Sequence, residues 1–233
     1  MVDNGKSIND TYTSKETIEN INNQVQMKEV MFSQTPGRYA LKSIMSGFLL
    51  AIVTVFMLGI KTQFAGTNEG LVNLMGAISF SLALVLIVLT NSELLTSNFM
   101  YLTVGWYYKI IGMNKALGIM LVCFLFNIIG GFILFALMKF TPIMTPEMIS
   151  SLTSMVDGKT IDSSWYAILV KAIFCNFFIN IGIYVSIQFK DGLSKAFFIA
   201  CGVIVFVFMG YEHVVFNAGL YLSLIHISDG ARE

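Results

Sequence analysis

Five long apolar blocks constrain the fold of this chain more than any other feature of its sequence. A helix needs about 20 apolar residues to cross the ~30 Å hydrocarbon core of a bilayer, and every block reaches that length. With 56% hydrophobic and only 12% charged residues, the chain has too little charge to cover a soluble domain. We therefore expect an all-α integral membrane protein. The blocks are Leu41–Ile60, Leu71–Thr90, Leu117–Met138, Trp165–Phe189 and Ala196–Leu222.

Polar residues interrupt the course of two blocks. The second block runs into NSELLTSN, Asn91–Asn98, and the fifth contains GYEHVVFN, Gly210–Asn217. Corresponding interruptions in the two halves of a chain are typical of inverted-repeat transporters and channels. We therefore expect an inverted repeat with broken helices in spans 2 and 5. In each motif a Glu stands five residues before an Asn, which matches Glu93 and Asn98 with Glu212 and Asn217.

The chain divides into three parts. Residues 1–36 are polar, and their stretch SKETIENINNQVQMKEVMF favours a short amphipathic helix that Pro36-Gly37 would end. We expect residues 37–221 to form the transmembrane domain. This part of the sequence contains five predicted spans, whereas an inverted repeat with three spans in each half would need six. Residues 222–233, LSLIHISDGARE, back-translate to CTGTCTCTTATACACATCT and onward, a transposon end sequence used in sequencing-library adapters. We expect an adapter artefact there and a domain truncated before span 6; a real short polar tail is the alternative.

The distribution of charge predicts an orientation and narrows the partners. Lys and Arg are enriched on the cytoplasmic side of membrane proteins, and seven lie on one side of the predicted spans against three on the other. We therefore expect a multi-pass protein of the cell (cytoplasmic) membrane with a cytoplasmic N-terminus. The formal net charge is zero, so nucleic-acid binding has no electrostatic support. The seven are Lys28, Arg38, Lys42, Lys109, Lys115, Lys190 and Lys195, and the three are Lys61, Lys139 and Lys159.

The sequence contains no motif that indicates a cofactor or a metal. It has no GxGxxG after a strand, no HExxH and no P-loop. Its three cysteines lie inside apolar blocks without CxxC spacing, so we interpret them as packed thiols and expect neither a disulfide frame nor a metal site. They are Cys123, Cys175 and Cys201.

His213 is an ionisable residue inside an apolar span, next to a Gly and a Glu at the second interruption. Ionisable groups in hydrocarbon are expensive and usually functional, although a structural His bonded within the bundle is the alternative. Half-helix N-termini carry partial positive charge and favour anions. His213 could therefore offer an N–H or a proton to a small anion, with the Thr96 hydroxyl orienting the imidazole. We expect Glu93 and Glu212 to accept hydrogen bonds from loop amides and hold each break in shape.

Three stretches of sequence together resemble the formate/nitrite transporter family, whose members are pentameric channels with an aquaporin-like fold. They are NSELLTSNFMYLTVG, Asn91–Gly105; FCNFFINIGIYV, Phe174–Val185; and GYEHVVFNAGLY. The resemblance covers Gly37 to about Tyr221. Within the family, SEL-T-N combined with GYEH is more similar to the nitrite branch than to the formate branch.

The resemblance implies roles for individual residues and a homopentameric assembly. His213 matches the central pore His, and Thr96 matches the Thr of the broken second span. Asn176 matches the Asn of span four, and Lys159 resembles the vestibule Lys, although it stands one residue further from Asn176 than the family pattern. Two apolar constrictions are implied as well, with Phe80 and Leu84 at one and Phe206 at the other; from the residues alone, ordinary helix packing explains these three.

We expect a passive or proton-coupled channel for small monovalent anions, nitrite first, with formate or hydrosulfide as alternatives. Apolar rings would oppose a bare anion, and protonation of the anion near His213 would remove that cost. A membrane-embedded enzyme with Glu212 and His213 as acid and base is a second class, but the sequence lacks a further metal or nucleophile cluster. A structural or signalling multispan protein is a third, and it leaves the paired interruptions unexplained.

Overall fold

The computed structural model of the protein describes residues 11–160 and 163–221. Residues 222–233, and with them the predicted adapter artefact, lie outside this range. The described chain is built from helices, with one isolated β-bridge between Thr11 and Phe189. The helices are α1 (Ser14–Gln34), α2 (Pro36–Gln63), α3 (Glu69–Leu89), α4 (Leu95–Tyr107), α5 (Met113–Met138), α6 (Pro146–Thr160), α7 (Trp165–Ile187) and α8 (Gly192–Phe208), and residues 214–221 are helical as well.

The expected all-α membrane architecture is confirmed. Four described helices are long and apolar enough to cross a bilayer: α2, α3, α5 and α7, with 28, 21, 26 and 23 residues. The fifth predicted span is divided between α8, which is apolar but has only 17 residues, and the helical residues 214–221. The expectation of five spans out of six stays a prediction.

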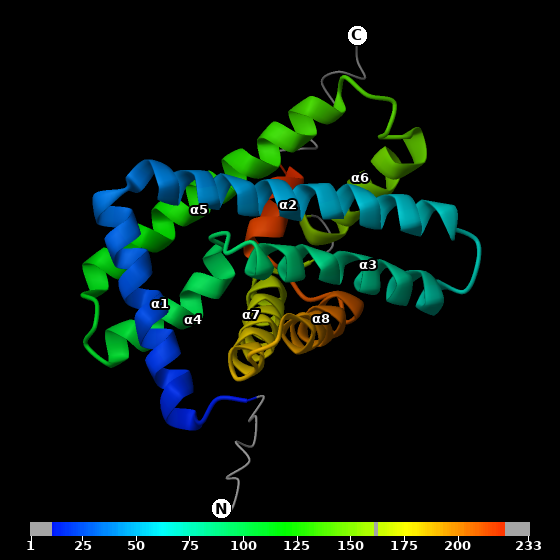
Figure 1. Ribbon diagram of the computed structural model, residues 1–233. Coiled ribbons are helices and arrows are strands. Elements are labelled where there is room, and N and C mark those ends of the chain that lie inside the picture. The colour runs from blue at the N-terminus through cyan, green and yellow to red at the C-terminus, as the bar shows by residue number, and fades with distance from the viewer. Residues whose placement is uncertain (1–10, 161–162, 222–233) are drawn as a thin grey trace, which may run out of the picture.

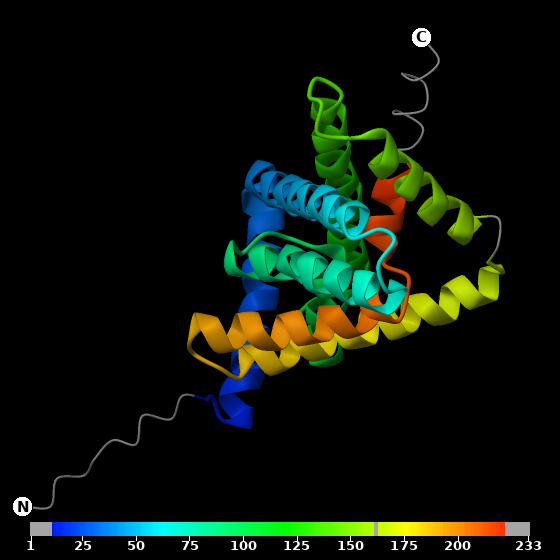
Figure 2. The same cartoon turned by 90° about the vertical axis from the view of Figure 1, so that its right-hand side faces the viewer.

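The long helices pack in layers. Figure 2 shows α2, α3 and α8 lying side by side in that order, with α7 against α8, and each of these neighbours is in contact. Helix α5 crosses α2 at very close range. A Cβ added to Gly47 would lie 1.8 Å from the backbone oxygen of Asn127, and one added to Gly130 would lie 1.9 Å from that of Ile44. Only glycine permits this approach of two backbones.

The chain leaves the helical conformation at both polar motifs. Helix α3 ends at Leu89 and α4 begins at Leu95, while α8 ends at Phe208 and the helix resumes at residue 214. Each break contains one residue in the left-handed region, Asn91 with φ 52° and Gly210 with φ 67°. Asn and Gly are the residues that adopt this conformation at least cost.

A matching backbone bond supports an internal repeat. The N–H of Glu93 donates to the carbonyl of Lys42 in α2 at 3.2 Å, and the N–H of Glu212 donates to the carbonyl of Lys171 in α7 at 3.4 Å. Each break is thus joined to the first long helix of its own half.

Helix α1 is the predicted amphipathic N-terminal helix. It starts with a capping box in which Thr13 and Glu16 bond reciprocally, and it ends at Gln34, just before Pro36 opens α2. Figure 1 shows α1 running past α4 to the start of α2. Its Val25 packs against Gly105 of α4, where an added Cβ would lie 2.5 Å from the valine side chain. The N-terminal segment is therefore docked onto the first half of the helical domain.

Candidate functional site

His213 lies at the second break and caps the helix that follows it. Its Nδ1 accepts the backbone N–H of Phe216 at 3.1 Å, as an N-cap side chain does. Because Nδ1 is an acceptor, we assign the hydrogen of the neutral ring to Nε2. Nε2 lies 3.3 Å from the hydroxyl oxygen of Thr96, so the ring donates and the threonine oxygen accepts. Both side chains are buried, with His213 3% and Thr96 0% exposed.

The bond between Thr96 and His213 joins the two breaks. Thr96 is the second residue of α4, and His213 immediately precedes the helical residues 214–221. Two half-helix N-termini therefore meet at this bond, and each carries partial positive charge. Among the described residues the Thr96 hydroxyl has no second hydrogen-bond partner. Its own hydrogen is thus available to an acceptor such as an anion.

An apolar cavity adjoins the His213 ring. Phe206 lies nearly parallel to the imidazole, with centroids 6.1 Å apart and planes inclined by 26°. The predicted constriction residues Phe80, Leu84 and Phe206 all line this one cavity, although the family resemblance implied two separate constrictions. A bare anion in such surroundings loses its hydration without compensation. The remaining lining residues are Leu50, Ala83, Ile87, Leu94, Ile179 and Val203.

Each break also contains a buried carboxylate that is paired with a lysine and an asparagine. Glu93 accepts the Lys28 ammonium at 2.6 Å and the Asn98 amide at 3.2 Å. Glu212 accepts the Lys159 ammonium and, at 2.8 Å, the amide of its own Asn. The expected loop-amide donors are thus replaced by side chains. The physical reason is that a charge this deeply buried requires an opposite charge beside it. That second Asn is Asn217.

Lys28 was not recognised from the sequence as part of the site. From the sequence, Lys28 served only to predict orientation, whereas its side chain is 8% exposed and its Nζ also lies 5.1 Å from the centre of the Tyr101 ring. A signal was present in the spacing of α1. Its buried residues are Thr17, Ile21, Val25 and Lys28, so the lysine occupies the inward face of the amphipathic helix.

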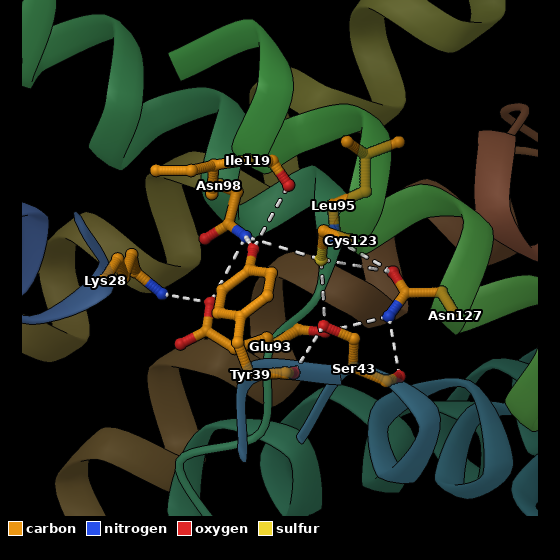
Figure 3. Close-up of polar contacts among 9 residues, drawn as sticks. All are labelled: Lys28, Tyr39, Ser43, Glu93, Leu95, Asn98, Ile119, Cys123 and Asn127. Carbon is orange, nitrogen blue, oxygen red and sulfur yellow. Dashed lines mark hydrogen bonds and ion pairs between the residues drawn. The ribbon is translucent and has the colours of Figure 1, made fainter. Parts of the chain in front are cut away.

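A larger polar network surrounds the first break, and its members on α2 and α5 were also missed. Figure 3 shows it: Tyr39 accepts the Asn98 amide at 3.2 Å and donates to the Ile119 carbonyl at 3.3 Å. The Cys123 thiol donates to the Glu93 carbonyl at 3.4 Å. Their partners are distant in sequence, so no local pattern marks them. The other two cysteines are Cys175, which is buried, and Cys201, which is exposed.

Two predicted site residues lie outside the His213 cavity. Asn176 is half-buried on α7 and donates to the Ala172 carbonyl at 2.9 Å, while its own side-chain oxygen is buried without a partner among the described residues. Lys159, on α6, is paired with Glu212 as described above. The structure therefore brings Thr96 and His213 together, and it joins Lys159 to the same break through Glu212. No group of three metal-ligating side chains occurs within the described ranges.

Comparisons with known proteins agree with this architecture. Two relatives are the "Formate channel FocA" of Haemophilus influenzae, 28% identical over 179 residues, and the "Probable formate transporter" of Methanothermobacter thermautotrophicus, 28% identical over 205 residues. The alignments cover 76% and 82% of this chain and 63% and 72% of the relatives. The chain thus spans less than two thirds of the length of the first.

Solved structures show the same fold. An "FNT family ion channel" superposes with a TM-score of 0.80 at 20% identity, covering 90% of this chain and 82% of the other. A "Pentameric formate channel with formate bound" gives 0.73 at 21% identity, covering 82% and 75%.

A family model completes the comparison. The model described as "Formate/nitrite transporter" matches residues 15–231. This is a family of transporters, so the alternative of a membrane-embedded acid/base enzyme is wrong. Because that match covers nearly the whole chain and the fold agrees with it, the protein belongs to the formate/nitrite transporter family.

Proposed function

We propose that the protein is a membrane channel for small monovalent anions and that the Thr96–His213 pair is the point that an anion must pass. The observation that carries the proposal is the meeting of two half-helix N-termini at a buried hydrogen bond beside an apolar cavity. This combination offers donors and partial positive charge to an anion. It also supplies an apolar barrier that a hydrated ion would not cross unaided.

The Thr96 hydroxyl makes the first contact with the anion in this proposal. Its oxygen is occupied by the His213 ring, so its hydrogen points away from the pair toward whatever acceptor arrives. The Nε2 hydrogen of His213 then exchanges Thr96 for the anion and adds a second donor. Both donors come from side chains at the beginning of half-helices, where the macrodipole supports them.

The His213 ring is neutral while it caps its helix. A second proton on the ring would have to enter at Nδ1, the atom that accepts the Phe216 N–H. If the neutral ring gave up its Nε2 hydrogen outright, it would become an anion itself. The imidazole therefore donates a hydrogen bond, and the proton that neutralises the permeating anion arrives from the surrounding water. The neutral acid then crosses the apolar cavity at far lower cost than the ion.

Nitrite is the substrate that we propose first, because the SEL-T-N and GYEH motifs are more similar to the nitrite branch of the family. Formate is the second candidate, and it is favoured by the two relatives named as a formate channel and a probable formate transporter. We further propose a homopentamer in the cytoplasmic membrane with the N-terminus in the cytoplasm. The name of one structural neighbour, a pentameric channel, supports the assembly.

Flux through reconstituted protein tests the proposal. The full-length protein and its His213→Phe variant are placed in liposomes, and nitrite and formate uptake are measured at several external pH values. A hydrogen bond to a charged group contributes about 1.5–3 kcal/mol, so the variant should lose roughly 10- to 100-fold in rate. Leu82→Phe is the matched control, because Leu82 is 46% exposed on α3 and the substitution adds the same ring.

The outcomes separate the candidate functions. Uptake of nitrite but not formate would establish the first substrate, and the reverse would establish the second. If His213→Phe transported both anions at the wild-type rate and with the wild-type pH profile, His213 would be a packing residue and the proposed pore would be wrong.

A further inference from the structure

We propose that Asn127 is the positioning residue of the first break: it caps α4 from a neighbouring helix and so holds the Thr96 hydroxyl opposite His213. The inference rests on the proposed function, because it concerns the same pair of residues. It adds a residue of α5 that contacts no permeating anion in this arrangement.

Helix α4 begins without a cap of its own. Its N-cap residue is Leu94, whose apolar side chain makes no capping bond. The first N–H of the helix, that of Leu95, instead donates to Oδ1 of Asn127 at 3.0 Å. A side chain 32 positions away thus does what a Ser, Thr or Asp normally does locally.

The same amide also fastens the preceding loop. Nδ2 of Asn127 donates to the Glu93 carbonyl and to the Ser43 carbonyl, both at 2.8 Å. Figure 3 shows the amide between these groups, with Leu95 on its other side. One side chain therefore connects α2, the break and the start of α4. Because Asn127 is only 1% exposed, water cannot replace these bonds without entering the packed interior.

Asn127 is itself held firmly. Its backbone carbonyl is the atom that an added Cβ on Gly47 would meet at 1.8 Å, so it sits in the closest part of the α2–α5 crossing. Thr96 follows Leu95 directly, and the capped N–H and the hydroxyl are therefore on adjacent residues. A shift of the cap would move Thr96 relative to His213, whose position is fixed separately.

The two sides of the Thr96–His213 bond are positioned by different means. His213 caps its own half-helix through Nδ1, so the ring that forms the bond also fixes the second break. Thr96 has no such role, and its half-helix is capped by Asn127. Removal of Asn127 should therefore uncouple Thr96 from His213 and leave the second break intact.

A mutant cycle on flux tests the positioning role. In the full-length wild type, Thr96→Val removes the hydroxyl that donates a hydrogen bond to the charged anion, so it should lower anion flux by roughly 10- to 100-fold. In an Asn127→Leu background the hydroxyl is already displaced from both His213 and the path of the anion, so the same change should lower flux by less than about 1.5-fold, as expected for coupled residues. Asn127→Asp keeps Oδ1 as the capping acceptor but loses the Nδ2 donor to the Ser43 and Glu93 carbonyls, so it should recover only part of the sensitivity to Thr96→Val.

Leu134→Ala is the matched control. Leu134 lies on the same helix and is 1% exposed, but it belongs to a separate apolar cluster. This variant should lose thermal stability while its flux remains fully sensitive to Thr96→Val. If Thr96→Val lowered flux by the same factor in the wild-type and Asn127→Leu backgrounds, Asn127 would be a structural residue only and the inference would be overturned.

Solid-state NMR of protein labelled with ¹⁵N-histidine tests the inference without transport. The His213 signals are assigned by their loss in His213→Phe. Asn127→Leu should shift the Nε2 signal to its position in Thr96→Val, whereas Leu134→Ala should leave it in place. An unshifted Nε2 signal in Asn127→Leu would overturn the inference, and if Asn127→Leu does not assemble, Asn127→Ala, which also removes Oδ1, is judged by the same criterion. Absent flux in the wild type would overturn the proposed function alone.

Discussion

The buried ion pair between Lys28 and Glu93 should stabilise the docking of α1 by an amount that mutation can measure. The side chains are 8% and 6% exposed, and their charged atoms are 2.6 Å apart. Lys28→Met keeps most of the side-chain length but leaves the Glu93 carboxylate buried without its cation. Breaking such a pair costs about 3–5 kcal/mol. The exposed pair of Lys15 and Glu19 is the internal control, because Lys15→Met should cost less than about 0.5 kcal/mol.

The double variant separates the pair from its parts. Lys28→Met combined with Glu93→Gln removes both charges, and the Gln amide can still accept from Asn98. Replacement of a buried pair by neutral residues of similar size is often close to neutral for stability. We therefore expect the double variant to be more stable than Lys28→Met alone, with a coupling energy of about 2–4 kcal/mol.

Thermal unfolding of the detergent-solubilised protein measures these effects. For a chain of this length, about 1 kcal/mol corresponds to 2–4 °C in Tm, so Lys28→Met should lower Tm by roughly 6–20 °C. The double variant should recover most of that loss. If Lys28→Met had no larger effect than Lys15→Met, or if the double variant were as unstable as the single one, the buried pair would not hold α1 in place.

Three further predictions concern the break, the helix crossing and the N-terminal helix. Thr96→Val should lower anion flux in liposomes by roughly 10- to 100-fold with unchanged assembly on gel filtration, because its hydroxyl donates to the charged anion; unchanged flux would contradict the role of Thr96 beside His213. Gly47→Ala should lower Tm and the yield of assembled protein because its Cβ has no room beside α5, whereas Gly59→Ala, with nothing within 4 Å, should not. Hydrogen bonds donated by Thr13 lower the pKa of Glu16 below its ordinary value. The capping box therefore stabilises α1 fully at pH values above the ordinary Glu pKa, and this stabilisation is lost as the pH falls through the lowered pKa. The protection of the amides in the first turn of α1, measured relative to their intrinsic exchange rate at each pH, should fall over that acid range, and Glu16→Gln should abolish this change in protection.

Local spacing decided which parts of the site could be predicted from the sequence. The Glu and Asn of each pair stand five residues apart within a single motif, so the sequence singled out all four residues, although it predicted loop amides and not the Asn side chains as the donors. The bond from Thr96 to His213 spans 117 positions, and only the matched interruptions and the family resemblance pointed to it. Helix α1 was predicted as an amphipathic segment, but pairing Lys28 with a carboxylate 65 residues away required the fold.

Asn127 shows the limit of such reasoning most clearly. It stands in an unbroken apolar helix, and its hydrogen-bond partners on the break and on α2 lie 32 to 84 positions away. A lone Asn in a membrane helix has several possible partners, and the sequence gives no means of choosing among them. The cap formed by His213 was missed for a different reason. Its partner is only three residues away, but His is not among the residues that usually cap helices.

The cap on Nδ1 connects the fold of the second break to the chemistry that we propose for it. An imidazolium at His213 would lose the Phe216 N–H and leave that donor unpaired in an apolar site, besides placing a new cation in low dielectric. Both costs keep the ring neutral. A neutral ring can hold an anion through Nε2 and can also release it, whereas a permanent cation beside an apolar cavity would bind the anion and hinder its exit. We infer that passage is fastest for anions that are readily protonated from water. The selectivity of the channel would then depend on the acidity and size of the conjugate acid. His213 and Thr96 would hold the anion at the position where it is protonated.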